Sequence, residues 1–392
     1  MKILHTISSV NPAGGGPIEG VKQLAFVNQT YGHTIEVASL DPPDAAFLKD
    51  FPLPVHPLGP GYLKYHFSRR FVPWLQQHAR DYDIVIVNVL WQYQGFGAWR
   101  ALRRGPTPYV VFTHGMLDPW FKRTYPLKHL KKLLYWPWGE YRVLRDAGAV
   151  LFTCEEERVQ ARLSFGLYRC NEVVVNYGTA GPQNIPNRGL EEFRARFPEL
   201  RNKRLAIFLG RLHEKKGCDL LIQAFASVLA PNPDWHLLIC GPDQGNIQAK
   251  LQDIAANLNI SNRITWTGMI AGDLKWGALH ASEVFVLPSH QENFGIAVAE
   301  ALACGLPALI SDKVNIWQEV QQDGAGIVGT DSLEGTIDVL KTWRDMPPQQ
   351  QKEMRSKTIH CFNIRFEIHN AAMNLLSVLF KVSHERANHV HD

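Results

Sequence analysis

Two glutamates, Glu292 and Glu300, stand eight positions apart in the run from His290 to Pro307. An apolar run precedes them and predicts a buried strand that ends in a loop. Asn293 can cap a helix, and the alanine-rich stretch after Gly295 predicts that helix. The helix N-terminus then lies beyond the carboxyl end of the strand, where ligands bind in open α/β sheets.

The start of this predicted helix offers groups for one extended ligand. The backbone amides of Phe294, Gly295 and Ile296 suit a phosphate or a sugar hydroxyl. Glu292 in the loop and Glu300 within the helix could each hold a different part of that ligand. Taken alone, the run leaves open two solvated glutamates on a surface helix.

A second strand–loop–helix unit is predicted over Phe208–Phe225, and its loop is basic. Arg211 and Lys216 follow the strand and lie near the helix N-terminus. A forked guanidinium and a point-charge ammonium at that place suit a diphosphate. A leaving nucleoside diphosphate gains negative charge where such cations stabilise it most. The alternative is a basic surface loop.

The first predicted turn is rich in glycine: Gly14, Gly15 and Gly16 are followed by Gly20. Glycine lets the backbone approach a ligand closely and donate N–H groups to phosphate. The spacing departs from the G-x-G-x-x-G fingerprint of dinucleotide sites, although Asp41 stands about where a ribose-binding acid would. A purely structural turn is equally consistent with the pattern.

His114 ends another predicted strand and is followed by Gly115. An imidazole at the carboxyl end of a strand can bond a sugar hydroxyl or a transition-state charge, although a lone histidine is more often structural. Asp118 is a nearby candidate for the acceptor side. Asp81 and Asp83 resemble a metal-binding D-x-D pair, but they precede a strand, so we interpret them as a solvated turn.

The composition indicates a soluble globular protein of two domains, since 392 residues with 45% hydrophobic and 20% charged content exceed one ordinary core. No run of 18 apolar residues predicts a membrane span. The six cysteines are scattered and show no C-x-x-C motif. We therefore expect reduced core cysteines in a cytoplasmic protein, and no metal site.

Positive charge is concentrated between Trp120 and Arg145, which hold seven Lys or Arg, one acid and seven aromatic residues. Lys122 and Arg123 in this window are candidates for the acceptor side. Basic and aromatic residues together suit a membrane headgroup region or an anionic lipid-linked substrate. An ordinary solvated helix is the alternative, and we do not expect nucleic acid as the partner.

Short apolar runs alternate with helical patterns along the whole chain, which predicts parallel doubly wound sheets. The predicted strands are Lys2–Thr6, Thr34–Ser39, Ile84–Asn88, Tyr109–Thr113, Val150–Thr153, Val173–Val175, Leu205–Leu209, His236–Cys240, Ile264–Thr267, Val284–Leu287 and Ala308–Ser311. Thr179–Gly189 reads as a linker, and Gln349–Phe380 as one long helix that could return to the first domain. The C-terminal tail from His384 is expected to be mobile.

Taken together, these residues resemble the retaining family 4 glycosyltransferases, which have the GT-B fold. The resemblance covers nearly the whole chain. Its most specific part is the signature of two glutamates separated by seven residues, Glu292 and Glu300. The elements GRLHEKKG, THGM, FTCEEE and VNYGT occur in the family's order, although VNYGT departs from the commoner form of the hinge segment.

The resemblance implies a role for each matching residue. Glu300 would bond the ribose of a nucleotide sugar, and Glu292 would face the donor sugar. Arg211 and Lys216 would clamp the diphosphate, and His114 would bond the transferring sugar. The further donor contacts would be Gly15, Gly16, Gly241, Met269, Ile270, Asn293, Phe294, Gly295 and Ile296.

The resemblance also implies two Rossmann-like domains facing a cleft. We expect an acceptor-side domain over 1–183, completed by a C-terminal helix near 362–385, and a nucleotide-sugar domain over 184–361. The implied activity is retaining, metal-independent transfer of glucose or a close relative from a UDP-sugar to a saccharide or lipid-linked saccharide in polysaccharide (exopolysaccharide) biosynthesis. No cofactor is implied, and 120–145 could contact the inner face of the membrane.

Two other functions remain open from the residues. One is an NAD-type dinucleotide oxidoreductase, which would use the turn from Gly14 to Gly20 together with Asp41. It leaves Arg211, Lys216 and the two glutamates unexplained. The other is a non-catalytic scaffold that binds an anionic surface through 120–145 and has a degenerate donor site.

Overall fold

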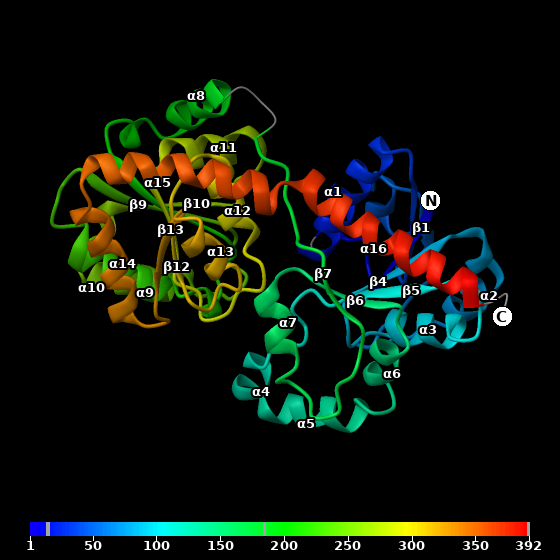
Figure 1. Ribbon diagram of the computed structural model, residues 1–392. Coiled ribbons are helices and arrows are strands. Elements are labelled where there is room, and N and C mark those ends of the chain that lie inside the picture. Colours follow the sequence, from blue (N-terminus) through cyan, green and yellow to red (C-terminus); the bar gives the residue numbers. More distant parts are fainter. Residues whose placement is uncertain (13–15, 183–185, 390–392) are drawn as a thin grey trace. The chain divides into compact units, whose positions relative to one another are not determined.

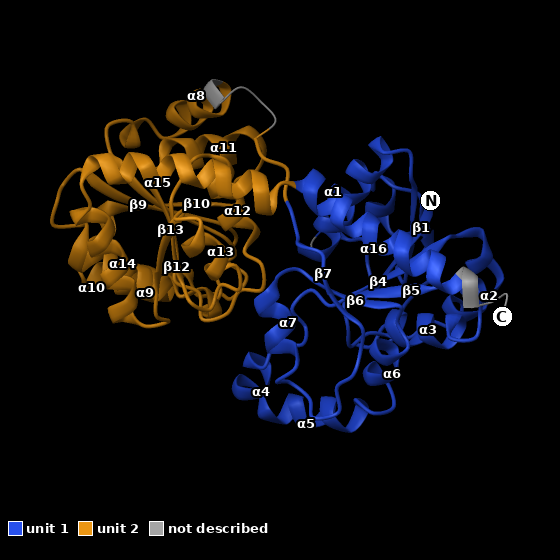
Figure 2. Ribbon diagram, viewed as in Figure 1, with its two compact units in different colours: residues 1–178, 368–392 blue, residues 179–367 orange. Residues whose placement is uncertain are grey.

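The computed structural model describes the chain except for residues 13–15, 183–185 and 390–392 (Figure 1). The chain divides into two compact units, 1–178 with 368–392, and 179–367 (Figure 2). Sequence analysis placed this division a few residues later, at 183/184, and the return of the chain slightly earlier, near 362. Each unit has its own parallel sheet with its own buried core.

Unit 1 is built on a seven-stranded parallel sheet in the order β3-β2-β1-β4-β5-β6-β7. Its strands are β1 (Lys2–Ile7), β2 (Thr34–Ser39), β3 (Val55–Pro57), β4 (Ile84–Asn88), β5 (Tyr109–Phe112), β6 (Ala149–Phe152) and β7 (Glu172–Val174). Its helices are α1 (Gly16–Thr30), η2 (Ala46–Leu48), α2 (Phe71–His78), η3 (Ala79–Asp81), α3 (Tyr93–Leu102), α4 (Trp120–Thr124), α5 (Pro126–Tyr135), α6 (Glu140–Arg145), α7 (Glu155–Ala161) and α16 (Ile368–His389).

Unit 2 is built on a six-stranded parallel sheet in the order β10-β9-β8-β11-β12-β13. Its strands are β8 (Arg204–Leu209), β9 (Trp235–Cys240), β10 (Ile264–Gly268), β11 (Val284–Leu287), β12 (Ala308–Ser311) and β13 (Gly326–Gly329). Its helices are α8 (Pro186–Arg196), η4 (Pro198–Leu200), η5 (Glu214–Lys216), α9 (Cys218–Val228), α10 (Gln248–Asn257), η6 (Ser261–Arg263), α11 (Gly272–Ala281), α12 (Ile296–Ala303), α13 (Trp317–Gln322), α14 (Leu333–Asp345), α15 (Pro348–Cys361) and η7 (Phe362–Phe366).

The central strands read as continuous apolar runs because both faces of each sheet are covered. The strand residues of β4, β5, β6, β9 and β11 are all buried. This is the pattern expected of parallel sheets with helices on both faces. The predicted parallel α/β class is confirmed.

The strand orders define where ligands should bind. In unit 1 the order reverses between β1 and β4, and in unit 2 between β8 and β11. Loops after these neighbouring strands leave in opposite directions, which opens a crevice at the carboxyl edge of the sheet. The motif residues that follow β8 and β11 therefore meet at the switch point of unit 2.

Several local predictions were wrong. Strands β3 and β13 were missed, since β3 ends in Pro57 and β13 begins and ends in glycine. Gln349–Phe380 is not one helix, because the chain passes through a π-helical turn over Phe362–Phe366 and an extended Glu367 before α16 begins. The C-terminal tail was expected to be mobile, which stays a prediction: its residues to His389 belong to α16, and 390–392 lie outside the described residues.

The linker is shorter than predicted, because α8 already begins at Pro186. Before the gap at 183–185, Thr179 forms a parallel bridge with Glu367, and its backbone N–H donates to Phe366 O at 3.0 Å. Asp83 accepts a hydrogen bond from the backbone N–H of Lys2 at 2.7 Å, and Asp81 ends the short η3 helix. Both aspartates thus belong to the turn before β4.

Candidate nucleotide-sugar site

The two loops that leave β8 and β11 are joined by hydrogen bonds. The backbone N–H of His290 donates to Lys215 O at 2.8 Å, and Lys215 Nζ donates to Gln291 Oε1 at 3.4 Å. Gly217 has a φ of +66°, and a Cβ there would lie 2.0 Å from Pro288 O. Glycine is therefore required at this position, both for its backbone angle and for the close approach of the loops.

This approach brings Lys216 against Glu292, whose carboxylate pairs with its ammonium. Both side chains are largely buried. Burial lowers the pKa of Lys216 to about 7, and the neighbouring charges of Lys215 and Arg211 add to this shift. A buried cation whose charge is only partly compensated is prepared to receive an anionic ligand.

Glu292 is held in place through its backbone. Its N–H donates to Lys313 O at 2.9 Å, and its carbonyl oxygen accepts from the N–H of Asn315 at 3.0 Å. The loop after β12 therefore fixes the loop after β11. The sequence does not predict this support, because both bonds join main-chain atoms only.

Helix α12 begins two residues later than a cap at Asn293 would place it. Its N-cap is Gly295, in the left-handed region at φ +77°, and no side chain caps it. Asn293 Oδ1 instead accepts from Asn315 Nδ2 at 3.4 Å, and Phe294 is buried against Phe366. The uncapped amides at Gly295 and Ile296 are thus available for an anion, as a helix N-terminus allows.

Glu300 lies on α12 and is only 8% exposed. Lys275 Nζ, from α11, donates to Glu300 Oε1 at 2.6 Å and lies 4.3 Å from the ring centre of Trp276. The carboxylate of Glu300, which pairs with this lysine, can accept hydrogen bonds from hydroxyl groups. Sequence analysis missed Lys275, since nothing in the spacing of α11 marks it.

Arg211 is exposed and belongs to a neighbouring loop pair. Its Nη1 donates to Gln244 Oε1 at 2.9 Å, in the loop after β9. A Cβ on Gly241 would lie 1.8 Å from Gly210 O, so this position also needs glycine. Gly241 N–H donates to Gly268 O at 2.8 Å, next to Met269, which is 75% exposed, and Ile270, which is buried.

His114 follows β5 in unit 1, in the left-handed region at φ +49°. Its ring stacks on Phe112 at 4.5 Å, and its Nε2 lies 3.3 Å from Asn88 Oδ1. Burial, with the nearby His5, lowers the pKa of His114 to about 3. The imidazole is therefore neutral at physiological pH and can exchange hydrogen bonds with a hydroxyl group.

Glu157, which sequence analysis did not single out, holds the backbone on both sides of His114. Its Oε1 accepts from Thr113 Oγ1 at 2.6 Å and from the N–H of Gly115 at 2.5 Å. Its Oε2 accepts from the N–H and the Oγ1 of Thr153 at 2.7 and 2.6 Å. Three consecutive glutamates begin α7, and their order alone does not show that the third one turns inward.

The glycine turn is described only in part, and Gly15 lies outside the described residues. Gly16 starts α1, and its carbonyl oxygen accepts from Tyr177 Oη at 3.3 Å. A Cβ on Gly20 would lie 1.3 Å from Tyr177 Oη. Tyr177 also packs edge-on against His114 at 6.0 Å, so Gly20 makes room for a ring that supports the histidine loop.

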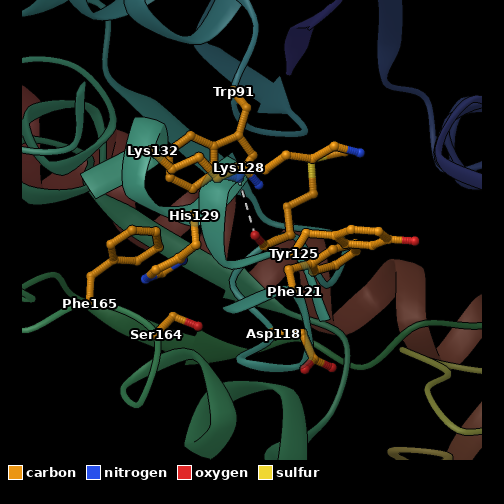
Figure 3. Close-up of a pocket in the computed structure, with 10 residues that line it drawn as sticks. Trp91, Asp118, Phe121, Tyr125, Lys128, His129, Lys132, Ser164 and Phe165 are labelled. Carbon is orange, nitrogen blue, oxygen red and sulfur yellow. Dashed lines mark hydrogen bonds between the residues drawn. The ribbon is translucent and has the colours of Figure 1, made fainter. Parts of the chain in front are cut away.

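The three acceptor-side candidates separate in the structure. Asp118 lines a 210 Å³ pocket of unit 1, shown in Figure 3, whereas Lys122 and Arg123 are exposed and do not line it. Within the described ranges, no helix combines the length and apolar character needed to cross a membrane. The described residues likewise contain no cluster of three His, Cys, Asp or Glu that could hold a metal ion.

Comparison with known proteins identifies the family. Residues 190–355 match the model of "Glycosyl transferases group 1", and residues 15–178 match the "Glycosyl transferase 4-like domain". The chain belongs to the group 1 (family 4) glycosyltransferases. The predicted family and its GT-B fold are thus confirmed.

Curated relatives of this glycosyltransferase are distant. The lipopolysaccharide core mannosyltransferase LpsB of Rhizobium meliloti is 26% identical over 53% of this chain and 65% of its own length. The D-inositol 3-phosphate glycosyltransferase of Streptomyces avermitilis is 27% identical over 74% of this chain and 64% of its own. The matched stretches of two further relatives, a glycosyltransferase of Methanocaldococcus jannaschii and the D-inositol 3-phosphate glycosyltransferase of Kineococcus radiotolerans, span only 37% and 47% of their lengths.

Solved structures show the same fold over nearly the whole chain. Sucrose-phosphate synthase of Thermosynechococcus elongatus aligns with a TM-score of 0.78 at 19% identity, covering 97% of this chain and 98% of that one. HepE of Anabaena, in complex with UDP and glucose, aligns with a TM-score of 0.76 at 19% identity, covering 97% and 100%. At these identities the likeness concerns the fold alone.

Proposed function

We propose that this glycosyltransferase transfers glucose or a close relative from a UDP-sugar to a saccharide or lipid-linked saccharide acceptor in polysaccharide biosynthesis. The proposed reaction retains the anomeric configuration and needs no metal. The observation that carries this proposal is the buried Lys216–Glu292 pair beside the uncapped N-terminus of α12, at the switch point of the unit 2 sheet.

Electrostatic stabilisation of the leaving group is the main task in this reaction. As the bond from the anomeric carbon to the diphosphate lengthens, the sugar becomes oxocarbenium-like and the diphosphate gains charge. Lys216, Arg211 and the amides at the start of α12 would neutralise that charge. Glu292, freed from Lys216 when the diphosphate takes its place, would face the sugar.

The two ends of the donor would have separate partners. Glu300, which pairs with Lys275, would accept hydrogen bonds from the ribose hydroxyls. Met269, which is exposed beside the buried Ile270, would contact the base. The neutral imidazole of His114, held by Asn88, would bond a hydroxyl of the transferring sugar.

Two structural relatives support UDP as the nucleotide. HepE of Anabaena has been solved with UDP-glucose, and an E. coli trehalose-6-phosphate protein with UDP-2-fluoro glucose. LpsB is a mannosyltransferase, so the distant curated relatives favour no single sugar. Glucose or a close relative is the choice that the structural relatives favour.

The contacts of Asp41 argue against a dinucleotide oxidoreductase. Its Oδ1 accepts from Ser9 Oγ at 2.6 Å, and its Oδ2 accepts from the N–H of Val10 at 2.8 Å. Asp41 is buried and closes the turn after β1. A dinucleotide site needs a carboxylate that hydrogen-bonds the ribose, whereas the carboxylate of Asp41 is already bonded within this turn.

The location we propose is cytoplasmic, with peripheral contact at the inner face of the membrane through 120–145. Leu127 and Leu134 on α5 are 77% and 72% exposed, and Trp138 is 67% exposed. Lysines alternate with these apolar side chains along the helix. An amphipathic helix of this kind suits a lipid headgroup surface, and we propose no nucleic-acid partner.

Proton NMR of the enzyme with UDP-[¹³C]glucose tests the proposed function. We expect UDP to be released, and the new anomeric signal to have the α configuration of the donor. EDTA should not change the rate. A β-configured product, dependence on added metal, or reduction of NAD⁺ in place of UDP release would contradict the proposal.

A further inference from the structure

A small pocket in unit 1 has a chemistry that the donor site does not use. Its 210 Å³ lie below the roughly 300 Å³ at which pockets for drug-sized ligands begin, so it admits one ring-sized group. Trp91 enters it from the loop after β4, Met116 and Asp118 from the loop after β5, and Ser164 from the segment after α7. The pocket therefore lies at the carboxyl edge of the unit 1 sheet, on the loop that carries His114.

Two lysine ammoniums are held on aromatic faces of this pocket (Figure 3). Lys132 Nζ lies 4.3 Å from the ring centre of Trp91 and 5.4 Å from that of Phe121. Lys128 Nζ lies 4.4 Å from the ring centre of Tyr125. Neither ammonium pairs with a carboxylate in the part of the chain that the structure describes. Aromatic faces hold a cation but leave its N–H donors free for an anion.

Hydrogen bonds hold Trp91, which forms one wall of the pocket. Trp91 has a positive φ of 68°, and its N–H donates to Oε1 of the fully buried Glu140 at 2.7 Å. Its Nε1 donates to Met116 O at 3.1 Å. A non-glycine residue in this backbone region persists only where its surroundings over-determine it, as at ligand sites. The indole is thus held in place before any ligand arrives.

The remaining polar groups suit hydroxyls. Figure 3 shows Ser164 and Asp118 on the side of the pocket away from Trp91 and Lys132. Ser164 Oγ donates to Leu117 O, which leaves its lone pairs for an incoming hydroxyl, and a carboxylate such as Asp118 only accepts. Two cations, aromatic walls and hydroxyl acceptors together recognise an acidic sugar better than a neutral sugar or a bare anion.

We propose that this pocket binds a sugar ring with an acidic substituent, a carboxylate or a phosphate, as part of the acceptor. The role of this sugar as the acceptor rests on the proposed transferase function, whereas its binding to the pocket does not. The acidic group would lie between Lys128 and Lys132, and the ring would pack on Trp91. Burial lowers the pKa of Lys132, with Glu140 opposing and Lys128 adding to this shift, and a bound anion would reverse it.

Saturation-transfer NMR titrations of the full chain test this pocket. The probes are glucuronic acid, glucose 6-phosphate, glucose and inorganic phosphate. At least one acidic sugar should bind about tenfold or more tightly than both glucose and phosphate, since its charge gains a hydrogen bond to a cation and its ring gains packing. Comparison of glucuronic acid with glucose 6-phosphate identifies the acidic group.

Two glutamine variants locate the binding. Lys132→Gln should weaken the acidic sugar about tenfold or more, and Lys128→Gln provides a second variant at an exposed position. Lys131→Gln is the matched control, because Lys131 is exposed on the same helix and does not line the pocket. The melting temperatures of all three variants establish that they fold.

The proposal is overturned if no acidic sugar binds, if glucose or phosphate binds as tightly, or if Lys128→Gln and Lys132→Gln both leave the affinity unchanged. UDP affinity is measured on the same samples. It should be unaffected by both pocket variants, because its proposed site is in unit 2. If the wild type fails to bind UDP, the proposed function fails, whereas the sugar titrations still decide the pocket.

Discussion

At the scale of single residues, the two charges that face each other at Lys216 and Glu292 decide what the site can do. Both charges are largely shielded from bulk water. Removing one of them would therefore leave the other buried and unpaired. A diphosphate that replaces Glu292 as the partner of Lys216 exchanges one ion pair for another. In the proposed reaction, this exchange would leave Glu292 facing the sugar, whose developing positive charge would replace the ammonium as its partner.

Lys216→Gln should lower kcat/KM by about 10²–10³-fold, because one preorganised donor to the leaving group is lost. UDP release from UDP-glucose measures the effect. Lys203→Gln is the control, since Lys203 is exposed just before β8, at the amino edge of the same sheet. Equal activity of the two variants would remove Lys216 from the site.

The affinity for UDP should depend on pH through Lys216. Its pKa of about 7 in the empty site means that the ammonium form prevails below pH 7 and is lost above it. Since the diphosphate favours the ammonium, binding takes up a proton above pH 7, and affinity falls as the pH rises from about 7 to about 9. Isothermal titration calorimetry in two buffers of different ionisation enthalpy measures both effects.

In Lys216→Gln this fall above pH 7 should disappear, because the variant has no ammonium to lose. A slope that persists in the variant would assign the pH dependence to another group. A wild-type affinity for UDP that rises between pH 7 and pH 9 would contradict proton uptake by Lys216 on binding.

At the scale of elements, the loop that follows β5 depends on a single side chain of α7. Glu157 accepts four hydrogen bonds, two from the loop and two from Thr153. The carboxylate thus fixes the left-handed backbone at His114 from a different element. If His114 bonds the sugar as proposed, Glu157 is a positioning residue that would act through His114 without touching the sugar itself.

Glu157→Gln should lower the free energy of unfolding by about 1–3 kcal/mol, because an amide nitrogen replaces one acceptor and meets donors. It should also lower kcat/KM by up to about 10²-fold through displacement of His114. Glu155→Gln, two positions earlier on an exposed face of α7, is the matched control. A purely structural role would change the unfolding energy but leave the kinetics intact.

Helix α5 should place the enzyme on anionic vesicles. Leu127→Ser with Leu134→Ser should reduce the partition coefficient by about tenfold or more, since each buried leucine contributes ~1.5–3 kcal/mol. Sedimentation with vesicles that contain phosphatidylglycerol measures this. Leu258→Ser, which changes a leucine of unit 2 that is 40% exposed, should have no effect. Unchanged sedimentation of the double variant would exclude this helix from membrane contact.

At the scale of the whole molecule, the sequence was most informative where both faces of a strand are covered. All eleven predicted strands occur, because continuous apolar runs such as Ile84–Asn88 are typical of parallel strands that are buried on both faces. The edge strands β3 and β13 escaped prediction, since proline and glycine obscure their pattern. After α15 the backbone leaves the α-helical conformation, and the spacing of apolar residues in the sequence does not reveal this change.

The candidate site could likewise be predicted only in part. The places of Lys216 and Glu292 could be predicted from their loops, because parallel strands send their carboxyl ends to one edge. Their mutual contact could not, since it depends on how Gly217 lets two loops approach. The sequence spacing of some elements gives no sign of a functional role, and this is true of the elements that carry Lys275, Glu157 and the pocket around Trp91. These groups are therefore recognised only from the structure.

The most direct test of the central claim is the thermal stability of the full chain with UDP, GDP, ADP and NAD⁺, each at equal concentration. UDP is expected to raise the melting temperature most, and Glu300→Gln and Lys216→Gln should abolish this rise while Lys203→Gln preserves it. A ligand present at about 100 times its Kd adds about 2.7 kcal/mol to the native state. Stabilisation by NAD⁺ alone, or an undiminished UDP response in both site variants, would contradict it.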